Sequence, residues 1–191
     1  MKIEYFFILV LLVMLYGCPL CINKVITENG PLVEEYKLSI PYQDGKIYKL
    51  KYSDSLVINF TAQRILEDLM VNNCAECCGE TQFQIDKTIL TADYPLFDIQ
   101  FELNNRDTTN IECYTKIGNT YFYIPVTEAQ ITRTDKIDSL IIDSISYKNV
   151  YVLYSNYSTN SNKPLDSLFY NYDFGIVKLI LSNDEIYTIF K

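Results

Sequence analysis

The sequence contains no histidine and no tryptophan, and its six glycines are scattered singly. Without histidine the chain cannot build a Ser-His-Asp or Cys-His catalytic site, nor a metal site with imidazole ligands. Single glycines do not form a phosphate-binding loop. Adjacent acids such as Glu34 and Glu35 point to opposite faces of a strand, so they do not make a paired-carboxylate site. We therefore predict a protein without catalytic activity, cofactor or metal ion.

Basic residues are also few. The chain has 16 Lys and Arg against 24 Asp and Glu, which gives a net charge of −8 at pH 7. An acidic surface without a basic stripe repels the phosphate backbone, so we expect no nucleic-acid partner. The composition leaves open whether the partner is a protein or a glycan.

The N-terminus, "MKIEYFFILVLLVMLYGC", holds an unbroken apolar run from Tyr5 to Tyr16. A membrane-spanning helix needs about 20 apolar residues, so this shorter run is more typical of a secretory signal. Its end, Leu15-Tyr16-Gly17-Cys18, resembles the lipobox of bacterial lipoproteins. The resemblance implies that residues 1–17 are a signal peptide and that Cys18 carries palmitate or similar acyl chains. An ordinary anchor helix, or a cleaved signal with an incidental cysteine, is the alternative.

The segment 18–31 ends in Gly30-Pro31 and is predicted to be a tether. Its nearest acid after Cys18 is Glu28. Under the resemblance to lipoproteins of the Bacteroidota, a distant acid implies a periplasm-facing position on the cell membrane or outer membrane. Residues 32–191 are then a β-domain, with 127–137 as the candidate boundary between two subdomains.

The rest of the chain alternates strand formers with turn formers. Asp44-Gly45 is a hairpin signal between "KLSIPY" and "KIYKLKY". The apolar residues of the stretch 56–72 fit both the two-residue period of a strand and the 3.6-residue period of a helix. We expect a strand to about Thr61 followed by at most one short helical turn. These patterns predict an all-β antiparallel sandwich or meander of about ten strands.

Two stretches are similar to elements of small Bacteroidota lipoproteins. They are the closing "DSISYKNVYVL…LFYNYDFGIVKLILSNDEIYTI" and, more loosely, "RILEDLMVNNCAECCGETQFQI". The resemblance implies an exported cell-envelope protein and specifies no activity.

Four cysteines are the disulfide candidates: Cys74, Cys77, Cys78 and Cys113. A zinc site usually needs two spaced pairs, and a redox C-x-x-C usually opens a helix in an αβ framework. In an oxidising compartment we instead expect Cys113 to pair with one member of the cluster. A thiol-redox protein that uses Cys74 and Cys77 is an alternative.

Two further patterns are ambiguous. The 17 tyrosines could line a sheet face that captures a sugar or a peptide, although tyrosine is also an ordinary strand residue. Asp-Ser/Thr-x triplets are similar to the acceptor sites of O-glycosylation in Bacteroidota, and this resemblance implies modification at Ser55, Thr108, Ser139, Ser144 and Ser167. Overall the sequence predicts a lipid-anchored envelope glycoprotein with a binding or structural role.

Overall fold

The computed structural model describes residues 25–52, 56–72, 79–93, 97–107, 109–155 and 166–191. Most of this is β-strand and very little is helix, which confirms the predicted all-β class. The strands are β1 (Val25–Glu28), β2 (Ile47–Tyr52), β3 (Leu56–Asn72), β4 (Gly79–Ala92), β5 (Ile99–Asp107), β6 (Asn110–Ile117), β7 (Thr120–Tyr123), β8 (Lys136–Ile142), β9 (Ile145–Tyr154), β10 (Ser167–Asn171), β11 (Gly175–Ile180) and β12 (Ile186–Ile189). Helices α2 (Glu34–Lys37) and α3 (Glu128–Ile131) are single turns. Of the helices described, none is long and apolar enough to cross a bilayer.

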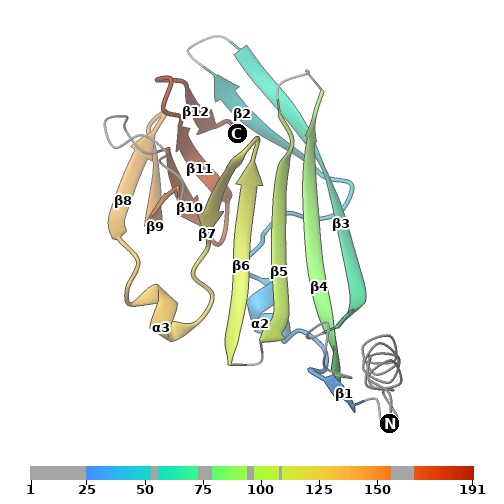
Figure 1. Cartoon of the computed structure of the whole chain (residues 1–191). Coiled ribbons are helices and arrows are strands. Elements are labelled where there is room, and N and C mark those ends of the chain that lie inside the picture. The colour runs from blue at the N-terminus through green and yellow to red at the C-terminus, as the bar shows by residue number, and fades with distance from the viewer. Residues whose placement is uncertain (1–24, 53–55, 73–78, 94–96, 108, 156–165) are drawn as a thin grey trace, which may run out of the picture.

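The strands form one 12-stranded sheet in the order β7-β6-β5-β4-β3-β2-β12-β11-β10-β9-β8, with β1 attached to β4. Neighbours pair antiparallel throughout this order, and only β1 is parallel to its partner. The chain is therefore a meander whose two halves are joined where β12 pairs with β2. The sheet curls, so that β3–β7 and β8–β12 lie on opposite sides of the interior, with α2 at one end (Figure 1).

The interior is filled by alternate residues of each strand. In β5 the inward positions Ile99, Phe101 and Leu103 have no exposed surface. Phe101 from the first half of the chain packs against Tyr170 from the second, with ring centroids 6.1 Å apart. Residues on both sides of the candidate boundary 127–137 thus share one sheet and one principal core.

Two local predictions were wrong. The helical spacing of residues 62–70 does not produce a helix, because β3 stays paired with β4 as far as Asn72↔Glu80. Continuous pairing along both strands outweighs a local helical preference. The second error concerns the hairpin expected around Asp44-Gly45: Glu34–Lys37 form α2, and no strand lies between α2 and β2. Residues 25–28 of the predicted tether form β1 and extend the sheet beside β4.

Candidate functional site

A segment that precedes the first long strands packs against one end of the interior of the curled sheet. We call residues 32–44 the plug; it includes α2 and contributes Leu32, Ile40 and Tyr42 to the core. Its backbone leaves the regular ladders here, so its carbonyl groups need partners other than neighbouring strands. The plug therefore depends on side chains from the sheet for its position.

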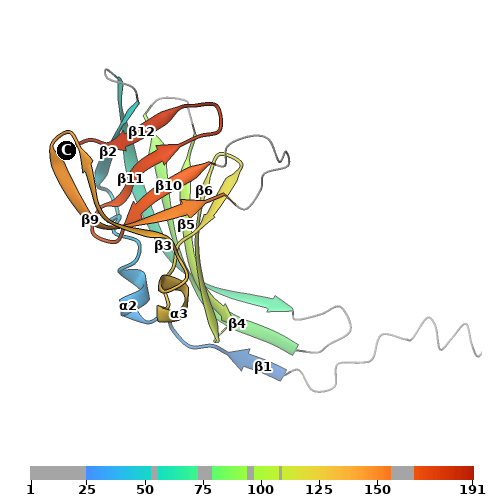
Figure 2. The same ribbon diagram turned by 90° about the vertical axis from the view of Figure 1, so that its left-hand side faces the viewer.

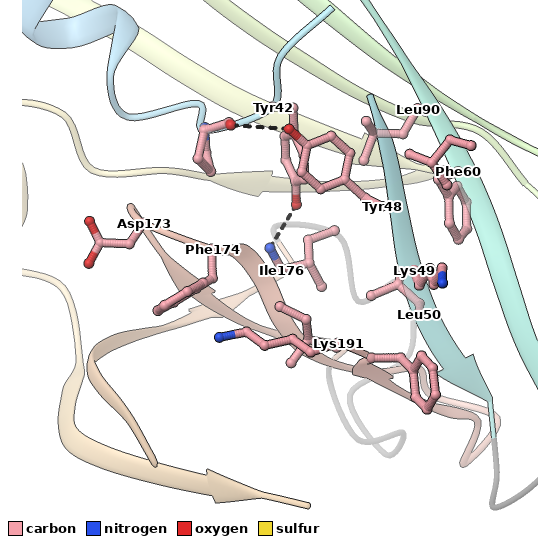
Figure 3. Close-up of a pocket in the computed structure, with 14 residues that line it drawn as sticks. Tyr42, Tyr48, Lys49, Leu50, Phe60, Leu90, Asp173, Phe174, Ile176 and Lys191 are labelled. Atoms are coloured by element: carbon pink, nitrogen blue, oxygen red, sulfur yellow. Dashed lines mark hydrogen bonds between the residues drawn. The ribbon is translucent and has the colours of Figure 1, made fainter. Parts of the chain in front are cut away.

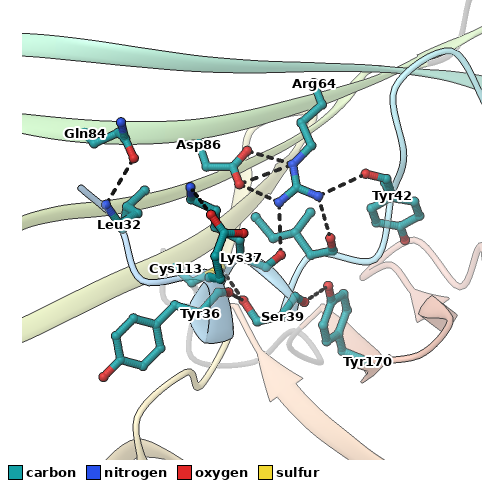
Figure 4. Close-up of polar contacts among 12 residues, drawn as sticks. Leu32, Tyr36, Lys37, Ser39, Tyr42, Arg64, Gln84, Asp86, Cys113 and Tyr170 are labelled. Atoms are coloured by element: carbon teal, nitrogen blue, oxygen red, sulfur yellow. Dashed lines mark hydrogen bonds and ion pairs between the residues drawn. The ribbon is translucent and has the colours of Figure 1, made fainter.

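Arg64 on β3 supplies most of these contacts (Figure 4). Its guanidinium donates to the Asp86 carboxylate on β4 through Nε, 2.9 Å from Oδ1, and through Nη2. It also donates to the carbonyl oxygens of Lys37, Ile40 and Tyr42 at 3.0, 3.2 and 3.4 Å. Asp86 is only 2% exposed. The charge-assisted bond to Asp86 raises the pKa of Arg64, so the guanidinium stays ionised. We call Arg64 and Asp86 the clamp.

Two tyrosine hydroxyls join the plug to the opposite side of the sheet. The Tyr170 hydroxyl donates to the Ser39 carbonyl at 2.6 Å. The Tyr42 hydroxyl accepts from the backbone N–H of Ile176 at 2.7 Å. Burial raises the pKa of Tyr42, so its hydroxyl is neutral at physiological pH. The plug is thus held from β3 and β4 on one side and from β10 and β11 on the other.

A pocket of about 330 Å³ lies between the plug and the C-terminal residues (Figure 3). We call it the C-terminal pocket. Several segments far apart in sequence line it: Pro41 and Tyr42 of the plug, residues 47–50 of β2, Phe60 of β3, Leu90 of β4, Asp173, Phe174 and Ile176 near β11, and residues 189–191. Tyr42 also contacts Tyr48 edge-to-face, with ring centroids 4.8 Å apart. The clamp that positions the plug therefore positions one wall of the pocket.

The floor and the rim of the pocket differ in character. Buried side chains form the floor: Leu50, Phe60, Leu90 and Ile176. Exposed apolar side chains form much of the rim: Ile47, Phe174 and Phe190.

Charged groups complete the rim. The Lys191 amine lies 3.9 Å from the centroid of the Phe174 ring, which stacks edge-to-face on Tyr147. Lys49 and Asp173 also line the opening. Apolar surface with a few charged groups is the usual composition of a small-molecule site, and this volume is at the lower end of the range for such sites. The C-terminal pocket is therefore the candidate binding site.

The cysteine prediction can be followed only at Cys113. Cys74, Cys77 and Cys78, and with them the thiol-redox alternative, lie outside the described residues, as does Cys18. Cys113 is a free, buried thiol on β6, near the Ser39 hydroxyl. It faces Leu103, which in turn faces Asp86, and Asp86 is seven residues along β4 from Gly79, or about 23 Å. Gly79, the described residue that follows the cluster in the sequence, therefore lies much farther from Cys113 than the roughly 7 Å that separates bridged Cα atoms.

The glycosylation candidates occupy different positions. Ser139 on β8 is exposed, and its hydroxyl lies 2.7 Å from that of Ser146. Ser144 is exposed in the turn between β8 and β9, with φ of 66°. Ser167 is half-buried in β10. Ser55 and Thr108 lie outside the described residues. Ser139 and Ser144 are thus the candidates with the best access.

Most tyrosines described by the structure point inward or are half-buried, and only Tyr123 and Tyr154 are exposed. One group nevertheless lies on the outer face of β6 and β7. Tyr114 faces Tyr123 across the two strands, and its ring centroid is 6.1 Å from that of Tyr121. The Lys116 amine lies 5.6 Å from the Tyr121 ring. We call Tyr114, Tyr121 and Tyr123 the tyrosine face.

Sequence reasoning missed both the clamp and the pocket. Arg64 follows Phe60 and Ala62 at alternate positions, and Asp86 precedes Thr88 and Leu90 in the same way. Charged residues at inward positions of a strand require partners, so this alternation was a usable signal. The pocket had no comparable signal. In the part of the chain that the structure describes, no group of three or more metal-ligating side chains is close enough to hold an ion.

Comparisons with known proteins give no match: no family model, no curated protein and no solved structure is significantly similar to this chain.

Proposed function

We propose that this protein is a lipid-anchored, non-catalytic binding protein of the cell envelope that holds a small, mainly apolar ligand in the C-terminal pocket. The observation that carries the proposal is the pocket itself, with a buried apolar floor and an exposed apolar rim. Exposed Ile47, Phe174 and Phe190 would lose water when a ligand enters. Burial of apolar area contributes about 25 cal/mol per Å², which favours ligands with a hydrocarbon or aromatic body.

The charges at the rim refine the class of ligand. Two lining residues, Lys49 and Lys191, have cationic side chains, and one, Asp173, has an acidic side chain. An anionic group at the opening would find two cations, whereas a cationic group would meet net repulsion. A short acyl chain with one carboxylate therefore fits both the floor and the rim.

The anchor rests on the sequence. The Leu15-Tyr16-Gly17-Cys18 motif supports acylation at Cys18, where each buried methylene contributes about 0.8 kcal/mol to membrane binding. The distance of Glu28 from Cys18 supports a periplasm-facing location. Exposure of Ser139 and Ser144 supports glycosylation of the β8–β9 hairpin. In this proposal the lipid holds the domain at the membrane and the pocket binds a ligand from the periplasm.

The absence of tryptophan allows a direct binding test. Phe190→Trp places a single indole at the rim, and Tyr154→Trp places one at an exposed position on β9 that does not line the pocket. Titration with decanoate should change the Phe190→Trp emission to a saturating limit and leave the Tyr154→Trp emission unchanged. Equal responses of the two variants, or none, would remove the support for the pocket as a binding site.

A paired substitution tests the charge preference. Ile47→Asp adds an acid at the rim, and Ile141→Asp adds the same acid at an equally open position on β8. The first should weaken decanoate binding several-fold and weaken decanol binding less, because only decanoate is charged. The second should change neither.

The tyrosine face supports a second candidate, capture of a sugar or a peptide. Tyr114, Tyr121 and Tyr123 offer rigid amphipathic area on an open sheet. Oligosaccharides added to isotope-labelled protein should then shift resonances of β6 and β7, and Tyr123→Ala should abolish the shifts while Tyr154→Ala retains them. Shifts confined to the pocket residues would exclude the tyrosine face and leave the C-terminal pocket as the binding site.

A further inference from the structure

Two strands run well beyond the sheet that packs around the core. β5 pairs with β4 only as far as Ile85, whereas β3 and β4 continue together to Asn72↔Glu80. Residues 79–84 therefore extend about 20 Å beyond the last β4–β5 pair, at 3.4 Å per residue. β1 runs parallel to this end of β4. We call residues 25–30, 66–72 and 79–84 the arm; Figure 2 shows it projecting from the body of the molecule.

The predicted lipid attachment lies close to the end of the arm. Val25, the first residue of β1, faces Gly79, the first residue of β4. Cys18 precedes Val25 by seven residues, which span at most about 25 Å when fully extended. Acyl chains on Cys18 would therefore hold the end of the arm nearest the bilayer.

The end of the arm carries exposed apolar side chains on both faces, and Glu28 and Glu80 share the face of Ile26 and Met70. Successive residues of a strand point to opposite sides, so Leu69 and Val71 share one face and Met70 lies on the other. Val25 is 64% exposed and Met70 is 52% exposed, and Ile26 and Leu69 are exposed as well. We call these residues the apolar tip: Val25, Ile26, Leu69, Met70 and Val71. Exposed apolar side chains gathered at one end of a sheet make that end a candidate interaction site.

Charge indicates what this tip can contact. The described arm residues include no lysine or arginine. Glu28, Glu67 and Asp68 are exposed, and a fourth acid, the half-buried Glu80, lies between Ile26 and Asn72. Arm contact with a bilayer would then rest on apolar burial alone and would be opposed by anionic lipid. These acids would also limit the depth of penetration, because charged groups are costly in the hydrocarbon core.

We propose that the apolar tip rests in the interface of the lipid bilayer and that the arm holds the body of the protein away from the membrane. This rests on the lipid anchor of the proposed function. Leu90 in the pocket floor is eleven residues along β4 from Gly79, about 35 Å of strand. The pocket would then face the periplasm at a distance from the bilayer, open to a ligand that arrives from solution.

Single tryptophans test the contact. Met70→Trp and Ile26→Trp are placed at the tip, and Ile141→Trp, at a 71% exposed position on β8, is the matched control. Each acylated full chain is reconstituted into phosphatidylcholine vesicles with or without bromine on the acyl chains. Emission of both tip variants should shift to shorter wavelength and lose intensity with brominated lipid, and the Ile141→Trp emission should not. Replacing part of the phosphatidylcholine by phosphatidylglycerol should reduce the loss at the tip.

Two outcomes would overturn the proposal. If the chain floats with the vesicles while neither tip tryptophan is quenched, the arm does not contact lipid. If the tip is then shielded from water only in native membranes, it contacts a protein partner. If the chain does not float, the anchor has failed. The same measurement on residues 18–191, held on nickel-chelating lipid by an N-terminal hexahistidine tag, still decides where the tip lies.

Discussion

Arg64→Met removes the guanidinium of the clamp and keeps the apolar stem of the side chain. The Asp86 carboxylate, 2% exposed, loses its cationic partner, and three plug carbonyls lose a donor. Breaking one side of a buried ion pair costs about 3–5 kcal/mol, because the remaining charge is left without compensation. We therefore expect Arg64→Met to lower the free energy of unfolding by that amount.

Urea unfolding followed by circular dichroism measures the loss. Glu34→Gln is the control, since it breaks the Lys37–Glu34 pair at a position where the Glu34 side chain is 86% exposed. Such a surface pair contributes about 0–1 kcal/mol. The Arg64→Met/Asp86→Leu double variant should be less destabilised than the sum of the single variants, because no buried charge remains.

The clamp also makes a functional prediction. Because it positions the plug and Tyr42 lines the pocket, Arg64→Met should weaken decanoate binding as well as stability. An unfolding free energy within about 1 kcal/mol of wild type would refute the reasoning, since that is the size of a surface ion pair. Unchanged binding would show that the plug is positioned without the clamp.

Three further predictions concern the interior. Gly175→Ala should destabilise the fold in thermal melts, because residue 175 has φ of 76° and a Cβ there would overlap the Tyr42 hydroxyl; Gly45→Ala, at a similar φ with open space around it, should cost less. Burial raises the pKa of the Cys113 thiol to about 12, so iodoacetamide at pH 8 should label its peptide only in the unfolded chain, and a disulfide at Cys113 would contradict this. Burial also raises the pKa of Tyr170 well above 10; its contribution to stability should be constant from about pH 7 to pH 10 and should fall as the pH rises further, whereas a flat profile to pH 12 would contradict a neutral buried hydroxyl.

The class of fold was predictable because its signals are local. Alternation in "LFDIQFEL" and "TNIECYT" gives the inward sides of β5 and β6, and Asp44-Gly45 gives the turn before β2. The secondary structure of residues 62–70 was not predictable, since both the strand period and the helix period fit and only pairing with β4 decides between them. For the same reason the sequence could not show that β1 joins the sheet.

The candidate site was much less predictable. Arg64 and Asp86 are 22 residues apart and meet only because β3 and β4 pair in this register. The pocket depends on the pairing of β12 with β2, which brings residues 189–191 next to residues 47–50. Composition could indicate that tyrosine is abundant, but its distribution between the interior and the tyrosine face follows from the curl of the sheet.

Native mass spectrometry of the chain extracted from its own membranes tests the central claim most directly. We predict a mass that lacks residues 1–17 and carries acyl chains, with a small apolar molecule retained by the wild type and by Ile141→Asp but depleted in Ile47→Asp. A chain that retains residues 1–17 without acylation, or one that carries no bound molecule and takes up no decanoate, would contradict the account.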